Sequence, residues 1–248
     1  MATQIVSVIN QKGGTGKTTT TINLGSALQK LGNSVLLVDL DPQSNLSYSL
    51  GITAPGATIA DMFTEGKAAA DIIIEKDGLS ILPGSTDLVD IEISLVTQPK
   101  REQFLKEMLR EIKGYDYVLI DCPPSLSLLT VNALVASDMV LIPLQMEVLT
   151  LQGLDQILGT ISKIQKAFNP DLKIKGIVVV MYDQRRKLSQ EVLEYLRENV
   201  QEKVFESRIR LNVKLAEAPS FGQSILDYQP SSYGAQDYMA LAEEFINN

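Results

Sequence analysis

Residues 11–19, Gln-Lys-Gly-Gly-Thr-Gly-Lys-Thr-Thr, lie between an apolar run and a segment with helical periodicity. This order of strand, glycine-rich loop and helix is the context that a phosphate-binding loop requires. Glycines let successive backbone N–H groups turn toward phosphate oxygens, and the start of the next helix adds partial positive charge. We expect the chain to bind and hydrolyse ATP, with Lys17 reaching the β- and γ-phosphates and the Thr18 hydroxyl ligating Mg²⁺. The expected ATP contacts in this loop are Gly13, Gly14, Thr15, Gly16, Lys17, Thr18 and Thr19.

Three aspartates stand at the ends of other apolar runs. Asp39 and Asp41 belong to Val-Asp-Leu-Asp-Pro-Gln, and Asp121 ends the run Val-Leu-Ile-Asp. Ligands of open α/β sheets bind at the carboxyl ends of the strands, so these carboxylates are expected beside the glycine loop. We interpret Thr18, Asp39 and Asp121 as the Mg²⁺ site, with Asp121 acting through water. Asp41 is expected to position or deprotonate the attacking water; a solvated turn aspartate is the alternative.

Short runs rich in Val, Ile and Leu alternate with longer segments of helical periodicity. The pattern predicts one α/β domain over residues 1–248, a P-loop NTPase with a doubly wound, mainly parallel sheet flanked by helices. The expected strands are 4–9, 34–39, 79–83, 117–121, 139–143 and 174–181. The expected helices are 17–31, 100–113, 151–168, 189–200 and 233–246. Only the segment 51–77 is expected to be an irregular, mobile insertion.

The composition limits the class of protein. A formal net charge of −8 argues against a surface coated in positive charge, so any nucleic-acid site must be confined to one face. One Cys and no His exclude a disulfide framework and a Cys/His zinc site within one chain, which indicates a reducing, cytoplasmic setting. The N-terminus lacks a signal-peptide pattern and no run reaches about 18 apolar residues, so we expect neither export nor a membrane span.

Three motifs in this order carry a resemblance: KGGTGKTTT at 12–20, VDLDPQ at 38–43 and VLIDCPPS at 118–125. The chain resembles the ParA/MinD family of deviant Walker-A ATPases. The strict G-x-x-x-x-G-K-[ST] pattern is kept only at its end, because Lys-Gly-Gly replaces its opening part. Two further stretches, MYDQR at 181–185 and NVKLAEAPSFG at 212–222, are similar to the short chromosomal ParA (Soj-like) branch. The match spans nearly the whole chain.

The resemblance implies roles in catalysis and in dimerisation. Lys12 would be the signature lysine, which contacts phosphate and often reaches the partner subunit's nucleotide in an ATP-sandwich homodimer. Gly13 would have to stay small so that this dimer can close. Asp41 matches the family's residue needed for hydrolysis. The implied catalytic residues are therefore Lys12, Lys17 and Asp41.

Two further ATP contacts are implied by the resemblance, at Met181 and Asn212. Asn212 lies where the family usually holds the adenine. The family usually has Ile-Pro-Arg-Asn before the following Val, whereas this chain has Ile-Arg-Leu-Asn at 209–212. The chain thus departs from the family pattern at the expected adenine contact.

Residues 185–214 contain eight Lys or Arg and five Glu, a local charge of +3 (8 − 5) in an acidic chain. In a ParA-like dimer this region is implied to form part of a nonspecific surface for double-stranded DNA, which scattered cations bind through backbone phosphates. The expected DNA contacts are Arg185, Arg186, Arg208, Arg210 and Lys214. The alternative is an ordinary solvated helix face. With DNA binding, the chain is expected to partition a chromosome or plasmid through a ParB-like adaptor protein, at the nucleoid.

Three alternative functions remain open. A MinD-like membrane positioner needs a basic amphipathic C-terminal helix, whereas residues 240–248 are acidic. A metabolic ligase would show substrate-dependent turnover, and a relative with an iron–sulfur cluster needs Cys pairs, whereas Cys122 is alone and fits a small buried hydrophobe. A ParA-like positioner of a protein cargo, such as a chemoreceptor array or a compartment, has the same ATPase. The first strand is expected so early in the chain that no helix-turn-helix, and hence no operator-specific repression, is expected.

Overall fold

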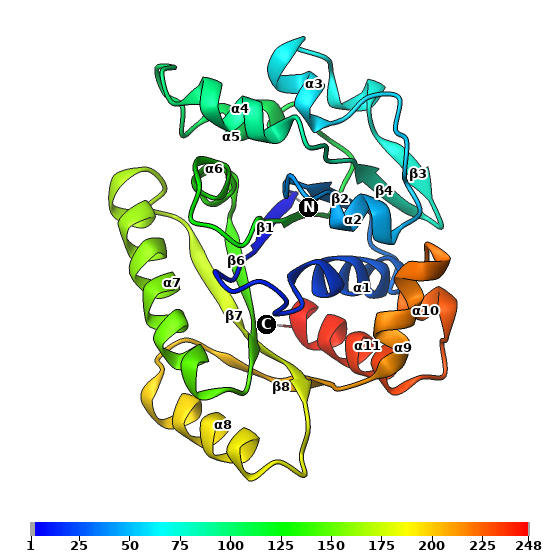
Figure 1. Cartoon of the computed structure of the whole chain (residues 1–248), viewed down its shortest axis with the longest axis vertical. Coiled ribbons are helices and arrows are strands. Elements are labelled where there is room, and N and C mark those ends of the chain that lie inside the picture. The colour runs from blue at the N-terminus through cyan, green and yellow to red at the C-terminus, as the bar shows by residue number, and fades with distance from the viewer. Residues whose placement is uncertain (1–2, 248) are drawn as a thin grey trace.

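The computed structural model describes residues 3–247, apart from the side chains of residues 148 and 149. Met1, Ala2 and Asn248, the last residue of the acidic tail, lie outside the described residues. A sheet with the strand order β3-β4-β2-β5-β1-β6-β7-β8 runs through the molecule (Figure 1). Its neighbouring strands are all parallel except β3 and β4. The strands are β1 (Gln4–Val8), β2 (Val35–Asp39), β3 (Ile74–Lys76), β4 (Leu79–Leu82), β5 (Tyr117–Asp121), β6 (Met139–Gln145), β7 (Lys173–Tyr182) and β8 (Val204–Arg210).

Helices cover both faces of this sheet (Figure 1). One face packs on α1 (Lys17–Lys30), α2 (Asn45–Ser49), α10 (Ile225–Tyr228) and the C-terminal helix α11 (Tyr233–Ile246). The other packs on α3 (Ile59–Thr64), α4 (Leu88–Leu95), α5 (Phe104–Leu109), α6 (Leu128–Ala136), α7 (Val148–Ala167) and α8 (Lys187–Asn199). The remaining elements are α9 (Val213–Glu217) and two 3₁₀ turns, η1 (Ala69–Asp71) and η2 (Ala218–Phe221).

The central strands are apolar on both faces because both faces are covered. In β2, Leu36 and Val38 enter the core beneath α3 to α8, whereas Val35 and Leu37 enter the core beneath α1 and α11. All four side chains are 2% exposed or less. This period of two within an unbroken apolar run is typical of a buried parallel strand.

The register of three strands brings polar residues to the same edge of the sheet. Asp121, at the end of β5, pairs with Val8 at the end of β1 and with Asp39 at the end of β2. The glycine loop leaves β1 directly after this level, and α1 then runs back along the sheet. Parallel pairing therefore places the loop and two carboxylates side by side, at the carboxyl edge where such folds bind ligands.

The expected fold class is confirmed, and the six expected strands form, although several other elements were missed or misplaced. The segment 51–77 was expected to be irregular, but it contains α3, η1 and the edge strand β3, and Thr58 with Asp61 forms a capping box at the start of α3. The helix expected at 100–113 is shorter: α5 spans only Phe104–Leu109, and Lys100 has a left-handed φ of 56°, which interrupts a helix. Strand β8 and helices α4 and α6 were not expected. None of the helices in residues 3–247 is long and apolar enough to cross a lipid bilayer.

Candidate nucleotide-binding site

The loop between β1 and α1 has the backbone of an anion cradle. Gly14 and Gly16 have φ values of 73° and 77°, in the left-handed region that favours glycine. Gly16 is the N-cap of α1 and has no side chain to cap the N–H groups of the first helical turn. Thr15 steadies the loop, because its hydroxyl donates to the Lys12 carbonyl over 3.1 Å. The first turn of α1 therefore keeps N–H groups that suit phosphate oxygens.

Lys17 is the first residue of α1, and its side chain lies back across the loop. Its Nζ is 3.4 Å from the carbonyl oxygen of Lys12, and the residue is 6% exposed. Burial lowers the pKa of Lys17, while the nearby carboxylates of Asp121 and Asp41 act in the opposite direction. A buried ammonium that spans the loop matches the role expected of Lys17, which is to neutralise phosphate charge.

Asp121 and Thr18 are in direct contact. The Thr18 hydroxyl donates to Oδ2 of Asp121 over 2.6 Å, and Asp121 is fully buried. Burial raises the pKa of Asp121 to about 8, the neighbouring charge of Asp39 adds to this, and the bond from Thr18 and the charge of Lys17 oppose it. Such a carboxylate is costly to ionise without a cation beside it.

Asp39 is held by the start of α2. Its Oδ2 accepts from both the N–H and the hydroxyl of Ser47, at 2.8 and 2.6 Å, whereas its buried Oδ1 has no hydrogen-bond partner. Burial raises the pKa of Asp39 to about 6 despite these bonds. Gly84 must lack a side chain, because a Cβ there would lie 2.8 Å from the Asp39 carbonyl oxygen.

These residues fit Mg²⁺ that arrives with a phosphate ligand. In residues 3–247 no group of three or more Asp, Glu, Cys or His side chains forms a metal cage. Mg²⁺ is usually held by one or two carboxylates, waters and substrate phosphates, and not by a dedicated protein cage. Thr18 and Asp121 together with the unpaired Oδ1 of Asp39 provide such a partial donor set.

Asp41 is buried beside this group, with an exposed fraction of 7%. Its Oδ1 accepts from the backbone N–H of Gln43 over 2.9 Å, which is the geometry of an Asx turn. The Asp41 charge also acts on Lys17 and on Asp121. Asp41 therefore forms an Asx turn and also lies near the phosphate loop. The turn does not exclude a role in hydrolysis.

Lys12 and Gly13 form the outer rim of the loop. The Lys12 ammonium pairs with Glu147, the N-cap of α7, over 2.6 Å, and both side chains are about half exposed (51% and 48%). The backbone N–H of Lys12 donates to Asn10, whose amide in turn donates to the Pro143 carbonyl. An exposed ion pair stabilises little, so Lys12 can exchange Glu147 for another anion. A Cβ at Gly13 would meet no atom within 4 Å.

A cavity of about 260 Å³ adjoins the loop, and it is lined by Asn212, expected at the adenine, and by Met181, the other ATP contact expected outside the loop. Met181 lies in its wall with a left-handed φ of 52°, which is uncommon for a non-glycine residue and typical of functional sites. The Oδ1 of Asn212 accepts from the N–H of Lys214 over 2.9 Å, which leaves its NH₂ group and the second lone pair of Oδ1 for a base. Gly16 and Tyr238 complete the link from this cavity to the phosphate loop.

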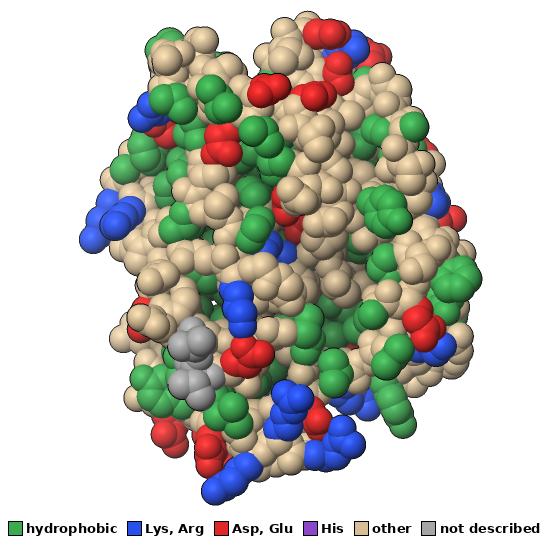
Figure 2. Space-filling model, viewed as in Figure 1, with side chains coloured by type: hydrophobic (Ala, Val, Ile, Leu, Met, Phe, Trp, Pro, Cys, Tyr) green, Lys and Arg blue, Asp and Glu red, His purple; other side chains and the backbone are tan. Residues whose placement is uncertain are grey.

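Several of the residues expected to contact DNA are paired with acidic side chains. Lys and Arg side chains gather at the end of the molecule that carries α8 and β8, with Asp and Glu between them (Figure 2). Arg185 is 84% exposed in its side chain but holds Asp183 through two bonds of 2.9 and 3.0 Å. Arg186 lies 3.9 Å from the same carboxylate. Lys214 pairs with Glu217 over 2.6 Å.

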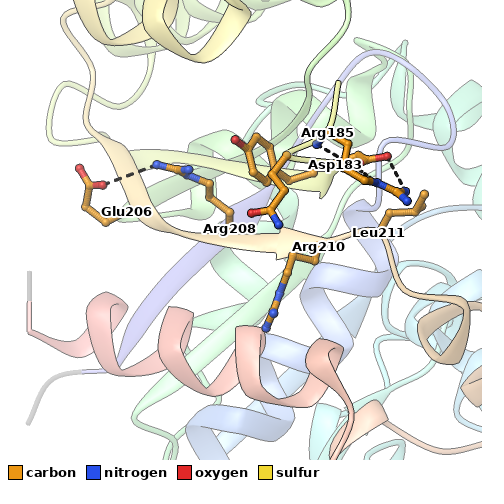
Figure 3. Close-up of a pocket in the computed structure, with 8 residues that line it drawn as sticks. Asp183, Arg185, Glu206, Arg208, Arg210 and Leu211 are labelled. Carbon is orange, nitrogen blue, oxygen red and sulfur yellow. Dashed lines mark hydrogen bonds and ion pairs between the residues drawn. The ribbon is translucent and has the colours of Figure 1, made fainter. Parts of the chain in front are cut away.

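Arg208 and Arg210 lie two residues apart on β8, and their side chains leave the strand in different directions (Figure 3). Arg208 lies over the ring of Tyr182, and it lines an open pocket of about 500 Å³ together with Arg185 and Arg210. The Arg210 side chain points away from those of Arg185 and Arg208, toward the C-terminal helix (Figure 3). There it binds Asp237 over 2.6 Å. The structure thus brings Arg185, Arg208 and Arg210 to one pocket, with Arg186 beside Asp183 at its edge, and the guanidinium of Arg210 is bound to Asp237.

The comparisons with known proteins agree on the family. Residues 3–174 match the family model of the AAA domain. The chain is 44% identical to the sporulation initiation inhibitor protein Soj of Bacillus subtilis over 250 residues, which cover 99% of both chains. It is 43% identical to the chromosome partitioning protein ParA of Caulobacter vibrioides over 98% of this chain and 94% of that protein. The chain belongs to the ParA/Soj family. A solved structure of cobyrinic acid a,c-diamide synthase from Mycobacterium smegmatis with bound ADP and magnesium is 36% identical to this ParA-family chain, with a TM-score of 0.86 over 98% of it and 93% of that chain.

The motifs of this ParA-family chain did not identify several residues at the site. Ser47, Glu147 and Asp237 hold Asp39, Lys12 and Arg210 respectively. Ser47 lies eight residues after its partner, whereas the other two come from distant elements. Only the position of Ser47 in the short helix after VDLDPQ offered a local signal. The others depend on which helices the fold places over the sheet edge.

Lys17→Ala should abolish nucleotide binding. The buried ammonium would be lost, and phosphate charge would face only backbone dipoles, so affinity should fall at least a hundredfold, about 2.7 kcal/mol. Titration with a fluorescent ATP analogue measures this directly. Wild-type affinity in the variant would contradict the assignment of the loop.

Asp121→Asn should make the nucleotide-free protein more stable while removing Mg²⁺-dependent hydrolysis. Asparagine keeps an acceptor for the Thr18 hydroxyl but removes a fully buried carboxyl group whose pKa burial raises to about 8, so the folded state no longer bears the cost of protonating or ionising it near pH 7. A gain of about 1 kcal/mol would raise Tm by about 2–4 °C in a chain of this size. Thermal unfolding without nucleotide is the measurement. A lower Tm would show that the carboxylate stabilises the fold, and full Mg²⁺-dependent turnover would show that it does not serve the metal.

Proposed function

We propose that this ParA-family ATPase forms a homodimer around ATP, binds double-stranded DNA nonspecifically in that state, and partitions a chromosome or plasmid through a ParB-like adaptor. One observation carries the proposal. The buried group of Lys17, Asp41 and Asp121 lies beside an exposed rim formed by Lys12 and Gly13. The first set suits cleavage of a phosphate bond, and the second suits contact with another subunit.

The chain is an ATPase that uses ATP and Mg²⁺. The loop N–H groups and Lys17 bind the phosphates, and Thr18 with Asp121 and Asp39 forms the place for the metal. Mg²⁺, when bound, neutralises charge on the phosphate oxygens. Asp41, buried within the same group and fixed by its Asx turn, orients the attacking water or accepts its proton.

Dimerisation is supported by the geometry of the rim. The space beside Gly13 is open within the chain, so the need for a small residue there would come from a second subunit. Among the described residues the Lys12 ammonium is held only by an exposed pair with Glu147, and exchange of that partner for a phosphate across the interface costs little. A dimer would also place each cationic region twice on one assembly.

DNA binding is supported by the exposed cations near Arg185 and by two relatives of the chain. The proteins named Soj and ParA, at 44% and 43% identity, carry names from sporulation control and chromosome partitioning. Arg185, Arg186 and Arg208 present guanidinium groups around one open pocket or its edge. Their acidic partners reduce the field, so we expect weak binding by one subunit and useful binding only when dimerisation doubles the contacts. DNA binding would place the protein at the nucleoid.

The cargo is the least constrained part of the proposal. A protein cargo needs the same ATPase and differs only in its adaptor. The 36% identity to a structure named as a diamide synthase keeps an ATP-dependent ligase as the second candidate. One ATP-turnover assay distinguishes the partition ATPase from the ligase. Turnover by a partition ATPase should be stimulated by DNA and adaptor, whereas a ligase should turn over only with its acceptor substrate.

Asp41 and Gly13 variants should separate hydrolysis from dimerisation. Asp41→Ala should keep Mg·ATP bound and trap the dimer, since the loop and Thr18 stay intact. Asp41→Asn is the matched variant, because its side-chain oxygen can still accept the Gln43 N–H of the Asx turn. Gly13→Val should bind ATP as a monomer. Size-exclusion chromatography with light scattering, with and without ATP, distinguishes them.

The two outcomes that contradict these roles are specific. Normal hydrolysis by Asp41→Asn would mean that the carboxylate does not act on water. A Gly13→Val protein that dimerises with ATP would mean that the second subunit does not approach this rim.

Replacement of Arg185 and Lys214 by Ala should weaken ATP-dependent DNA binding without changing dimerisation or ATP affinity. Both side chains lie outside the phosphate loop, and a two-fold dimer presents each twice, so up to four phosphate contacts are lost. Each contact contributes about −0.9 to the slope of log K against log salt, so the slope should become shallower by up to about 3.6. Interferometry on the Asp41→Ala background, with two unrelated DNA sequences, measures the slope and its lack of sequence preference.

The matched control is Lys106→Ala with Arg110→Ala, which removes the same charge from α5, at the opposite end of the molecule from α8 (Figure 1). An equal loss in both double variants would indicate a general charge effect and not a site. Absence of DNA binding at low salt, with vesicle binding or substrate-dependent turnover instead, would replace the DNA proposal by one of the alternatives.

A further inference from the structure

Arg210 stands where the family that the chain resembles usually has a proline, just before the turn that leads to Asn212. It is the last residue of β8, paired in register with Tyr182 of β7. The turn is fixed on one side by the bond from the Leu211 N–H to the Tyr182 carbonyl, 3.1 Å long. A proline here would lock φ near −65° and stiffen the chain. Without it, the turn needs another restraint.

Asp237 of α11 supplies this restraint through both the backbone and the side chain of Arg210. Its Oδ2 accepts from the Arg210 backbone N–H over 2.9 Å, and its carboxylate accepts from Nε over 3.0 Å and from Nη2 over 2.6 Å. The ring of Tyr233, one turn earlier in α11, stacks on this guanidinium, with 4.2 Å between the ring centroid and Cζ of Arg210. Asp237 is only 9% exposed, so the guanidinium is held from a buried position. Figure 3 shows Arg210 directed at this helix.

The hydrogen bond from the Arg210 N–H to Asp237 explains why the turn can be restrained either by a proline or by this carboxylate. The Arg210 N–H donates to Asp237 and not to a neighbouring strand. A proline, which has no N–H, would lose no bond of the sheet at this position, and would leave Asp237 without its backbone donor. The restraint here therefore comes either from the ring of a proline or from a carboxylate on α11.

The restrained turn forms a wall of the cavity beside the phosphate loop. Arg210, Leu211 and Asn212 all line it, together with Met181 and Gly16. The same helix also reaches the phosphate side, because the Tyr238 hydroxyl lies 3.2 Å from the hydroxyl of Thr20 in α1. Helix α11 thus connects the base side and the phosphate side of the site through neighbouring residues, Asp237 and Tyr238.

We propose that Asp237 is a positioning residue for the nucleoside: it holds Arg210 so that Leu211 and Asn212 form a rigid wall against the base of ATP. This rests on the nucleotide site described above and adds to it a determinant that lies outside the family motifs. The hydrogen bonds of Asp237 go to Arg210 and not to the phosphate loop or to Asp39 and Asp121, so it governs affinity for the nucleoside and leaves the chemical step alone. Uniform binding of this kind changes KM and not kcat.

Asp237→Ala should weaken binding of ATP and of ADP about tenfold, with KM raised in proportion and kcat within twofold of wild type. Mg·tripolyphosphate, which has no base, should compete equally well against wild type and variant. Asp237→Asn keeps one acceptor, so its ATP affinity should lie between those of the wild type and Asp237→Ala. Glu243→Ala removes an exposed carboxylate from the same helix and should change nothing. Calorimetry with ATP, ADP and tripolyphosphate gives the affinities.

Rescue separates positioning from a general effect on folding. Adding Arg210→Pro to Asp237→Ala should restore ATP affinity to within about threefold of wild type, because the ring supplies the restraint. Unchanged ATP affinity in Asp237→Ala, or equal losses for ATP and tripolyphosphate, would overturn the proposal. Wild-type protein that binds tripolyphosphate as tightly as ATP would overturn the nucleoside cavity itself. Failure of wild type to bind either would overturn the proposed function together with this inference.

Discussion

Three carboxylates and one ammonium share the carboxyl edge of the sheet with almost no water around them. Asp39, Asp41, Asp121 and Lys17 are all 7% exposed or less, and burial together with the neighbouring carboxylates raises the pKa values of Asp39 and Asp121. Such an excess of buried negative charge is tolerable only where a cation completes it. The buried carboxyl groups therefore destabilise the ligand-free protein. Binding of a metal together with phosphate offsets this destabilisation.

The surrounding elements hold this group in register. Strand pairing fixes Asp39 opposite Asp121, the first helix brings Thr18 and Lys17 onto them, and the start of α2 binds Asp39 through Ser47. Ser47 also receives the N–H of Gly84, which connects the loop after β4 to the same carboxylate. A change in the metal site can thus be transmitted to α2 and to the loop after β4 through single hydrogen bonds, without any movement of the sheet core.

Local patterns in the sequence predicted the phosphate loop, the aspartates and the central strands, because these signals are continuous in the chain. Glycines, a lysine and apolar runs act over fewer than ten residues. Strand β8 was missed because its residues alternate with Glu206, Arg208 and Arg210, and such a run is read as a charged surface segment. The excess of three positive charges in residues 185–214 describes that segment alone and not the surface around it. Asp183, Glu217, Asp237 and Glu244 lie outside that segment and pair with its cations, which offsets the excess.

The same limit applies to the departure from the family pattern at Arg210. Read locally, a missing proline loosens the turn beside the adenine contact, and an arginine in a basic segment suggests a DNA contact. The structure gives this arginine a partner 27 residues away in α11, which neither local interpretation includes. A rigid turn can be made by a ring within the chain or by a buried carboxylate from another element. The second solution makes the nucleoside wall depend on how α11 packs, so a substitution in the C-terminal helix can alter ligand affinity while every motif residue stays in place.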